Sequence, residues 1–211
     1  SENKFVYVVD TGNNRIQKFT FDGEYISSFG KNDNSEGSLN SPRDIAIDAT
    51  GKLFVTDPGN KGINVYKDDG EFLRTFDSSV GGFSIFPTGI IFDENNNFYI
   101  SDQTNNRIIQ FNEYGVTLSV FGTMGDEKGQ FKVPKDIAID NKGFLYVVDS
   151  LAHQIQKFST PIVSEKLIIE EELKEQEATQ IQAEESESLS ELEEISEVKI
   201  ELQPVNPIPN D

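Results

Sequence analysis

A segment near the start of the chain returns three more times in weakened form. Residues 8–19, Val-Val-Asp-Thr-Gly-Asn-Asn-Arg-Ile-Gln-Lys-Phe, have copies at 55–66, 100–111 and 148–158. The aspartate of each copy lies 47, 45 and 47 residues from the previous one, and an aromatic residue follows each aspartate nine residues later. Repeats of this length are typical of propellers and other repeat arrays. The four repeat aspartates are Asp10, Asp57, Asp102 and Asp149.

Other residues keep the same register. A proline lies 15 residues before three of the aspartates, and a phenylalanine lies 19 residues after three of them. Length differences are therefore confined to the stretch between that phenylalanine and the next proline, which holds 12, 10 and 12 residues. A buried strand cannot gain a residue without turning its side chains to the opposite face, whereas a surface loop can. The pattern predicts a rigid unit with one variable loop.

Turn residues divide each unit into four short segments of strand-like composition. In the last copy we expect strands over 136–140, 144–149 and 154–158, and the complete copies add a fourth strand, such as 116–121. Gly and Asn between these segments supply the positive φ that tight hairpins need. Each unit is predicted to be a four-stranded antiparallel meander about the size of one propeller blade.

These residues resemble the NHL repeat family, whose units combine Pro-x-Gly/Asp-Ile-Ala-x-Asp, an aliphatic strand ending in Asp, and Asn-x-Arg-Ile-Gln-x-Phe. The resemblance covers residues 5–159. It implies an all-β fold, here a partial β-propeller of four-stranded antiparallel blades. Members of the family include substrate receptors of ubiquitin ligases, RNA binders, bacterial sensor domains and lyases. The fold therefore does not name an activity.

The arginine position of the family is filled in two of the four copies. Arg15 and Arg107 occupy it, whereas the copies that contain Asp57 and Asp149 have no arginine there. We expect contacts between aspartate and arginine to stabilise the turn in the two blades that have both. Exposed pairs of this kind contribute ~0–1 kcal/mol, so the other blades are expected to fold without them.

The number of expected strands predicts two complete and two partial blades. The first unit lacks its proline-containing strand, and the last ends at Phe158. We therefore expect a C-terminal fragment of a larger propeller with the remaining blades upstream, although residues 162–169 could supply the outer strand of the last blade. Unpaired sheet edges recruit other chains or aggregate.

The last quarter of the chain differs in composition from the rest. Residues 160–211 hold 15 of the 37 acidic residues and three of the 18 basic ones, and they contain no phenylalanine. High charge with few aromatic residues cannot bury enough surface to offset the entropy of the chain. We predict an incomplete ring of blades over 1–159 and an acidic, mostly disordered tail over 160–211, whose leucines could instead form a short partner-binding helix.

Few residues suggest catalysis or metal binding. His153, the only histidine, is expected in a surface turn, because one imidazole cannot supply the three-ligand set of a catalytic zinc. Asp48, Asp93 and Asp140 recur on one turn, where we expect them to bond to the local backbone. The alternative is calcium, which needs six to eight oxygens at one point. We predict no catalytic residue, no metal and no cofactor in this segment.

Charge and hydropathy limit the kinds of partner that can be predicted for this chain. Outside the tail the chain has 22 acidic and 15 basic residues, whereas nucleic-acid binding depends on attraction to phosphates, so no nucleic-acid partner is predicted. No run of ~18 apolar residues exists, so no membrane span is predicted in this segment. The absence of cysteine rules out disulfides and leaves the compartment open, because it is compatible with the cytosol and with secretion.

The three variable loops are the best candidates for binding a partner. In a ring they would emerge on one face, and they carry apolar and basic side chains of the kind that anchor interactions. Alternatively, the apolar side chains pack beneath their own loops. The candidate residues are Phe83, Phe86, Met124, Phe131, Lys128 and Lys132.

We therefore predict a non-catalytic propeller that acts as a protein-interaction or ligand-sensing platform through these loops, with a protein or peptide as partner. The resemblance leaves two alternatives. One is a lyase or lactonase-like enzyme whose metal ligands lie in upstream blades. The other is the substrate-recognition part of a ubiquitin-ligase-like protein, which would need a cysteine-rich zinc module upstream.

Overall fold

The structure is a computed structural model of the chain, and it describes residues 4–76, 79–80 and 83–160. The chain divides into two units, Ser1–Val163 and Ser164–Asp211, and all described residues belong to the first. The predicted acidic tail, its possible helix and the strand considered at 162–169 lie outside the described residues. Thr160 is described, and its hydroxyl donates a hydrogen bond of 2.7 Å to the carbonyl of Gly143.

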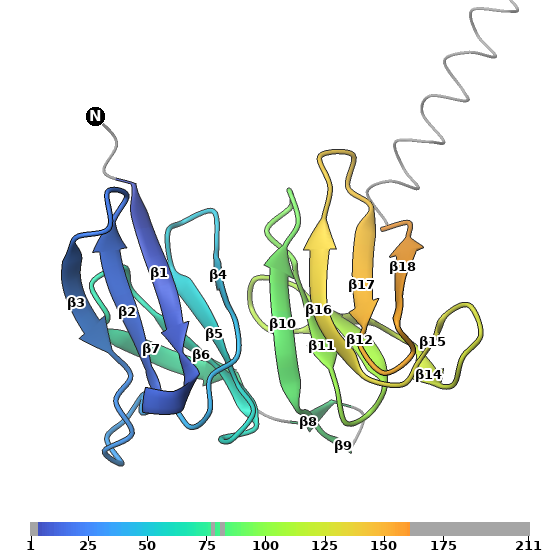
Figure 1. Cartoon of the computed structure of the whole chain (residues 1–211), viewed down its shortest axis with the longest axis horizontal. Coiled ribbons are helices and arrows are strands. Elements are labelled where there is room, and N and C mark those ends of the chain that lie inside the picture. Colours follow the sequence, from blue (N-terminus) through green and yellow to red (C-terminus); the bar gives the residue numbers. More distant parts are fainter. Residues whose placement is uncertain (1–3, 77–78, 81–82, 161–211) are drawn as a thin grey trace, which may run out of the picture. The chain divides into compact units, whose positions relative to one another are not determined.

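Four antiparallel sheets of three or four strands follow one another along the first unit, and we call them blades 1 to 4 (Figure 1). Blade 1 contains β1 (Phe5–Asp10), β2 (Arg15–Thr20) and β3 (Tyr25–Phe29), and blade 2 contains β4 (Ile45–Ile47), β5 (Leu53–Asp57), β6 (Gly62–Tyr66) and β7 (Phe72–Phe76). Blade 3 contains β10 (Pro87–Phe92), β11 (Phe98–Asp102), β12 (Arg107–Phe111) and β13 (Thr117–Phe121), and blade 4 contains β16 (Pro134–Ile139), β17 (Leu145–Asp149) and β18 (Gln154–Phe158).

This architecture confirms the predicted all-β fold with two complete and two partial blades. Within each blade every strand pairs in antiparallel fashion with the next strand along the chain. Five short elements were not predicted, because two or three residues leave no pattern in a sequence. They are the 3-10 helix η1 (Thr11–Asn13), the pair β8 (Ser79–Val80) with β9 (Phe83–Ser84), and the pair β14 (Thr123–Met124) with β15 (Gln130–Phe131).

The hairpin turns follow the predicted chemistry. Gly51 has a φ of 85° in the turn between β4 and β5, and Asn96 has a φ of 61° in the equivalent turn of blade 3. In the first of these turns Oδ1 of Asp48 accepts hydrogen bonds of 2.8 Å from the backbone N–H groups of Thr50 and Lys52. Asp93 accepts equivalent bonds from Asn95 and Asn97, and Asp140 accepts them from Lys142 and Phe144. These aspartates bond to the local backbone, as expected.

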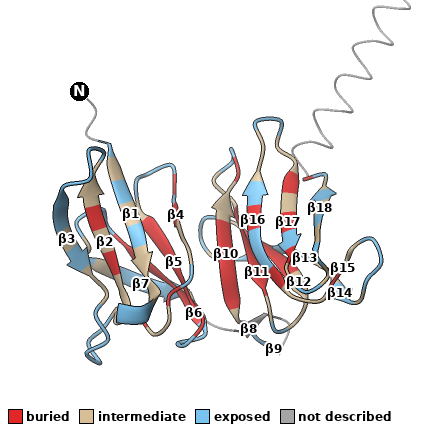
Figure 2. Cartoon of the chain, in the orientation of Figure 1, coloured by how far each residue is buried: buried red, intermediate tan, exposed pale blue. Residues whose placement is uncertain are grey.

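Apolar faces pack between successive blades. The cluster between blades 2 and 3 combines aliphatic side chains with a group of phenylalanines. The fully buried Phe98 lies at the centre of that group, with its ring centroid 5.4 Å from that of Phe54. A second cluster joins blades 3 and 4 around Tyr99 and Val147, and a third joins blades 1 and 2 around Ile16 and Leu53. Burial is therefore greatest on the strands of blades 2 and 3, as Figure 2 shows for β5, β10 and β11.

Two hydroxyl groups also connect neighbouring blades. Each belongs to the residue directly before a repeat aspartate. Oγ1 of Thr56 in blade 2 donates to the carbonyl of Thr88 in blade 3 at 2.8 Å, and Oγ of Ser101 in blade 3 donates to the carbonyl of Lys135 in blade 4 at 3.1 Å. These bonds hold the first strands β10 and β16 against the preceding blade, and thereby position the residues at the start of each first strand.

Candidate functional site

The repeat aspartates hold the variable loops in place. The backbone N–H of Asn40 donates to Oδ1 of Asp57 at 2.8 Å, and the N–H of Phe86 donates to Oδ1 of Asp102 at 2.9 Å. In each case the donor lies at the end of the loop that leads into the blade of that aspartate. In blade 4, Asp149 accepts the equivalent bonds from Lys132 and Val133. The repeat aspartates therefore fix where each loop meets its blade.

Arginine joins this arrangement in two blades. Nε of Arg15 and Nε of Arg107 each lie 2.8 Å from Oδ2 of their aspartates, Asp10 and Asp102. The expectation that these pairs are exposed is wrong for blade 3, where the aspartate side chain is 0% exposed and the arginine side chain 11%. The reason is that the loop ending at Phe86 covers the carboxylate and bonds to it.

Asp57 is buried without an arginine, because Gly62 occupies the position of the arginine in blade 2. Burial raises the pKa of Asp57 to about 6, and hydrogen bonds from Asn40 and Asn60 offset part of this effect. Blade 2 thus carries a buried carboxyl group whose negative charge has no cationic partner among the described residues.

The free energy of unfolding is expected to depend on pH through Asp57. Between its ordinary pKa of 3.8 and the folded value of about 6, the folded chain holds a proton that the unfolded chain releases. The stability contributed by this group therefore falls as pH rises through that window, by at most about 1.4 kcal/mol per pH unit. Urea unfolding of the wild-type chain and of Asp57→Asn at pH 4.5, 5.5 and 7 checks this. The advantage of the wild type over the variant should grow as pH falls, and a difference that is constant with pH contradicts it.

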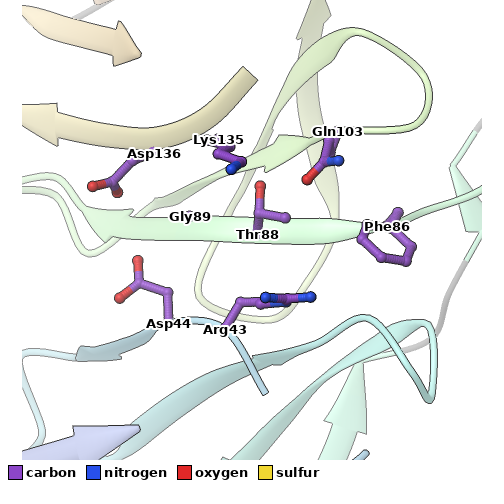
Figure 3. Close-up of a pocket in the computed structure, with 8 residues that line it drawn as sticks. All are labelled: Arg43, Asp44, Phe86, Thr88, Gly89, Gln103, Lys135 and Asp136. Atoms are coloured by element: carbon purple, nitrogen blue, oxygen red, sulfur yellow. The ribbon is translucent and has the colours of Figure 1, made fainter. Parts of the chain in front are cut away.

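A pocket of about 460 Å³ opens where residues of three successive blades meet (Figure 3). Arg43, Thr88 and Lys135 each follow a repeat proline directly, so they hold one position of the repeat in blades 2, 3 and 4. Because β10 contacts both β4 and β16, this position brings the three side chains to one place. The full lining is Arg43, Asp44, Phe86, Thr88, Gly89, Gln103, Lys135 and Asp136.

Two cations in this pocket have no partner among the described residues. Arg43 and Lys135 are exposed, and neither makes a side-chain hydrogen bond or ion pair within the described part of the chain. Figure 3 shows them on opposite sides of β10, with the amide of Gln103 above the strand and the ring of Phe86 at its end. The hydroxyl of Thr88 is occupied by a 2.8 Å contact with the hydroxyl of Ser101.

Two carboxylates lie at the other end of the pocket, and both bond to backbone. Asp44 accepts from the N–H of Ile90 in the next blade at 2.9 Å, and Asp136 accepts from the N–H of Ile137 at 2.9 Å. Burial raises the pKa of Asp44, and the nearby charge of Asp136 acts in the same direction. Gly89 takes the equivalent position in blade 3, where a Cβ atom would lie 3.0 Å from the Cα of Asp136. Blade 3 therefore has room for glycine but not for a third aspartate.

The predicted apolar anchors differ in their environments. Phe86 is half-buried and lines the pocket, and Met124 is exposed in β14. Phe131 is fully buried in the cluster between blades 3 and 4, so it packs beneath its own loop and is not an exposed anchor. The side chain of Phe83 lies outside the described residues, although its backbone belongs to β9.

The predicted basic residues and the histidine lie away from the pocket lining. Lys128 is exposed in the loop before blade 4, and Lys132 pairs with the carboxylate of Asp126 in the same loop. His153 is exposed and has a φ of 51°, in the turn position where blade 1 has Asn14 at the same φ. This is the surface turn expected for the histidine. Within residues 4–76, 79–80 and 83–160, no group of three or more acidic or histidine side chains could hold a metal ion.

Four antiparallel meanders stack face to face, and the first strands of blades 2, 3 and 4 lie beside one another. This arrangement defines a protein of the β-propeller class. Residues 131–158, which form blade 4 and the end of its loop, match the model of the NHL repeat. The described residues contain no helix long and apolar enough to cross a membrane.

Solved structures support the same class. The chain is 20% identical to a catalytically inactive virginiamycin B lyase from Staphylococcus aureus solved with quinupristin, over 76% of this chain and 54% of that one, with a TM-score of 0.55. The chain is also 20% identical to a Bacteroides thetaiotaomicron protein of unknown function, over 74% of this chain and 44% of that one, with a TM-score of 0.59. A chain in a nidogen/laminin complex is 22% identical to it, over 74% of this chain and 61% of that one, with a TM-score of 0.51. The chain spans about half the length of the lyase, and at these identities the likeness concerns the fold alone.

Proposed function

We propose that these blades form a non-catalytic binding module that recognises a protein or peptide segment through the pocket and the variable loops around it. The observation that supports this most strongly is the pair Arg43 and Lys135. They come from two blades and line one pocket, and neither makes an ion pair or a side-chain hydrogen bond with a described residue. We propose further that residues 1–159 form this module and that the acidic stretch 160–211 is a separate tail.

The chemistry of the pocket favours a carboxylate next to an apolar group. A guanidinium binds a carboxylate through two parallel hydrogen bonds, and an ammonium adds a second positive charge. The half-buried ring of Phe86 gives an apolar surface beside these cations, and the amide of Gln103 can orient a bound carbonyl or carboxylate. A peptide can present both groups, because its acidic side chains and its C-terminus carry carboxylates and its neighbouring side chains can be apolar. A peptide segment therefore fits the pocket better than a neutral metabolite does.

A larger partner would also contact the loops. The exposed Met124 is a flexible apolar side chain, a type common at adaptable binding surfaces. Nidogen, a solved protein with the same fold, is part of a complex with laminin. This supports a protein partner for the present chain, although it says nothing of which protein. The pocket and the loops together are the proposed binding face.

Titration with N-acetyl-phenylalanine, a carboxylate joined to an aromatic group, tests the pocket. We expect it to shift the NMR amide signals of Thr88, Gly89 and Gln103. The double variant Arg43→Ala/Lys135→Ala should bind at least about tenfold more weakly, because an ionic hydrogen bond contributes about 1.5–3 kcal/mol. The methyl ester of the probe, which lacks the carboxylate, should not shift these signals.

The matched control is Lys31→Ala/Lys142→Ala, which removes two exposed positive charges from outside the pocket lining and should leave binding unchanged. Equal binding by the pocket variant and the wild type would contradict the proposed site. If the acid and its methyl ester bind equally well, the two cations do not contribute to binding.

A further inference from the structure

The pocket carries a second pair of charged side chains that the proposed function does not use. Asp44 and Asp136 each follow directly after one of the two cations, so blades 2 and 4 both contribute a cation and then a carboxylate. Figure 3 shows the two carboxylates on opposite sides of β10, at the end of the pocket farther from the ring of Phe86, with the cations between that end and the ring. The pocket is therefore negative at one end and positive in its middle.

None of these four charged side chains makes an ion pair with a described residue, although all four line one pocket. The two carboxylates act on one another instead. Burial raises the pKa of Asp44, and the charge of Asp136 raises it further. The carboxylates therefore repel one another, and a positive group bound between them would remove that repulsion.

Backbone hydrogen bonds hold both carboxylates in position and leave part of their capacity free. Oδ2 of Asp44 accepts from the N–H of Ile90 at 2.9 Å, and its Oδ1 accepts from the N–H of Ile45 at 2.8 Å. Oδ1 of Asp136 accepts from the N–H of Ile137 at 2.9 Å, whereas its Oδ2 accepts no hydrogen bond from a described residue. An ionised carboxylate has about four acceptor sites, so both groups can accept further hydrogen bonds.

Blade 3 adds only backbone to this end of the pocket. Gly89 holds the repeat position of the two aspartates, and a Cβ atom there would lie 3.2 Å from Oδ1 of Asp136. Its φ is not in the left-handed region, so glycine is needed here for space and not for backbone conformation. The N–H of Gly89 donates to Oγ of Ser101 at 2.8 Å, which fixes this part of β10. The two carboxylates therefore face a rigid floor that has no side chain.

A primary ammonium group fits this end of the pocket better than a metal ion does. Calcium needs six to eight oxygens at one point. Two carboxylates that already bond to backbone cannot supply them, and the part of the chain that the structure describes has no group of three or more acidic or histidine side chains for a metal. An ammonium has three donors, which the free acceptor sites of two carboxylates can bind.

The short distance between the two charged regions favours the amino terminus of a peptide as the source of the ammonium. Each cation and the carboxylate that follows it are consecutive residues, whose Cα atoms are about 3.8 Å apart across a trans peptide bond. A ligand should therefore carry its positive and negative groups close together. The ammonium of an amino terminus lies directly on the backbone, whereas that of a lysine lies at the end of a flexible four-carbon stem.

We propose that the pocket binds the free amino terminus of a peptide, with its ammonium between Asp44 and Asp136. A carboxylate of the first or second residue of the peptide then lies between Arg43 and Lys135. Because the role of the two cations is taken from the proposed function, this proposal rests on it. The ligand class narrows from a segment that contains a carboxylate to a peptide end that carries both charges.

Two dipeptides that differ only at the amino terminus test this proposal on the full chain at pH 7. They are glycyl-phenylalanine and N-acetyl-glycyl-phenylalanine, which lacks the ammonium. Both should shift the NMR amide signals of Thr88 and Gln103. Only glycyl-phenylalanine should also shift those of Ile90 and Ile137, whose N–H groups bond to the two carboxylates. It should bind at least about tenfold more tightly than the acetylated peptide, because it adds an ionic hydrogen bond.

The variant Asp44→Asn/Asp136→Asn should abolish this preference, because asparagine keeps an oxygen that accepts from the backbone but carries no charge. Asp136→Asn alone changes only an exposed side chain and should reduce the preference while the fold is retained, as circular dichroism can check. The matched control is Asp22→Asn/Glu24→Gln, which removes two exposed negative charges from outside the pocket lining and should keep the full preference.

Equal binding of the two dipeptides would overturn this proposal and leave the proposed function intact. A preference that persists in Asp44→Asn/Asp136→Asn would do the same. N-acetyl-lysyl-phenylalanine, whose only ammonium lies on a side chain, should bind more weakly than glycyl-phenylalanine, and equally tight binding would overturn the choice of an amino terminus. If neither dipeptide binds, or if Arg43→Ala/Lys135→Ala binds both as the wild type does, the proposed function fails as well.

Discussion

Replacing Asp102 by alanine is expected to lower the free energy of unfolding by about 3–5 kcal/mol, as is typical when one partner of a buried ion pair is removed. The carboxylate is fully buried and accepts hydrogen bonds from Nε of Arg107, the N–H of Phe86 and the amide of Asn105. Alanine leaves these donors without their acceptor, and the loop that leads into blade 3 loses its attachment. Urea unfolding measures the difference.

Asp10→Ala is the matched control, because it breaks the same pair in blade 1, where the side chains of Asp10 and Arg15 are 20% and 32% exposed. Its expected cost is much smaller than that of Asp102→Ala, since water can solvate the groups that remain. The double variant Asp102→Ala/Arg107→Ala should recover part of the loss by removing the unpaired charge. If Asp102→Ala and Asp10→Ala cost the same, burial does not set the strength of these pairs.

Replacing Phe98 by alanine is expected to lower the free energy of unfolding by about 3–5 kcal/mol. This ring lies at the centre of the contact between blades 2 and 3 and is fully buried. Its centroid lies between 5.0 and 5.6 Å from those of four other phenylalanines, so the truncation leaves a cavity that rigid neighbouring rings fill poorly. Those four are Phe54, Phe76, Phe92 and Phe111.

Tyr114→Ala serves as the control for Phe98→Ala, because this aromatic residue belongs to the same blade but is exposed. It should change the free energy of unfolding by no more than about 0.5 kcal/mol. Thermal and urea unfolding at low protein concentration compare the two variants without contributions from association. A loss below about 1.5 kcal/mol for Phe98→Ala would show that blades 2 and 3 do not share this core.

The repeat made most of the fold predictable. A fixed distance from each aspartate to its proline and to its phenylalanines gave strands within two residues of β16, β17 and β18. The turn aspartates were also predictable, because Asp48 and its counterparts use local hydrogen bonds that depend on short sequence spacing. Contacts between blades were not predictable, since the hydroxyls of Thr56 and Ser101 bond to residues more than thirty positions away.

The candidate site was harder to predict than the fold, for two reasons. Arg43 and Lys135 occupy a position of the repeat that is threonine in blade 3, so in the sequence they resemble tolerated variation until stacking places them in one pocket. Phe131 was predicted as a binding anchor because it lies in a loop, but the structure shows that its side chain is buried. The residue after each repeat proline was the available signal for the pocket.

Contacts between aromatic rings of different blades test the stacking of the four repeats most directly. At least one such pair spans each junction. The three pairs to follow are Phe29 with Tyr66, Phe54 with Phe98, and Phe121 with Phe158, with ring centroids 5.0, 5.4 and 5.2 Å apart. Nuclear Overhauser spectra should contain cross-peaks for all three pairs, as for Phe98 with Phe111 inside blade 3, whose centroids are 5.0 Å apart. A spectrum with the last cross-peak and none of the first three would contradict a stacked array.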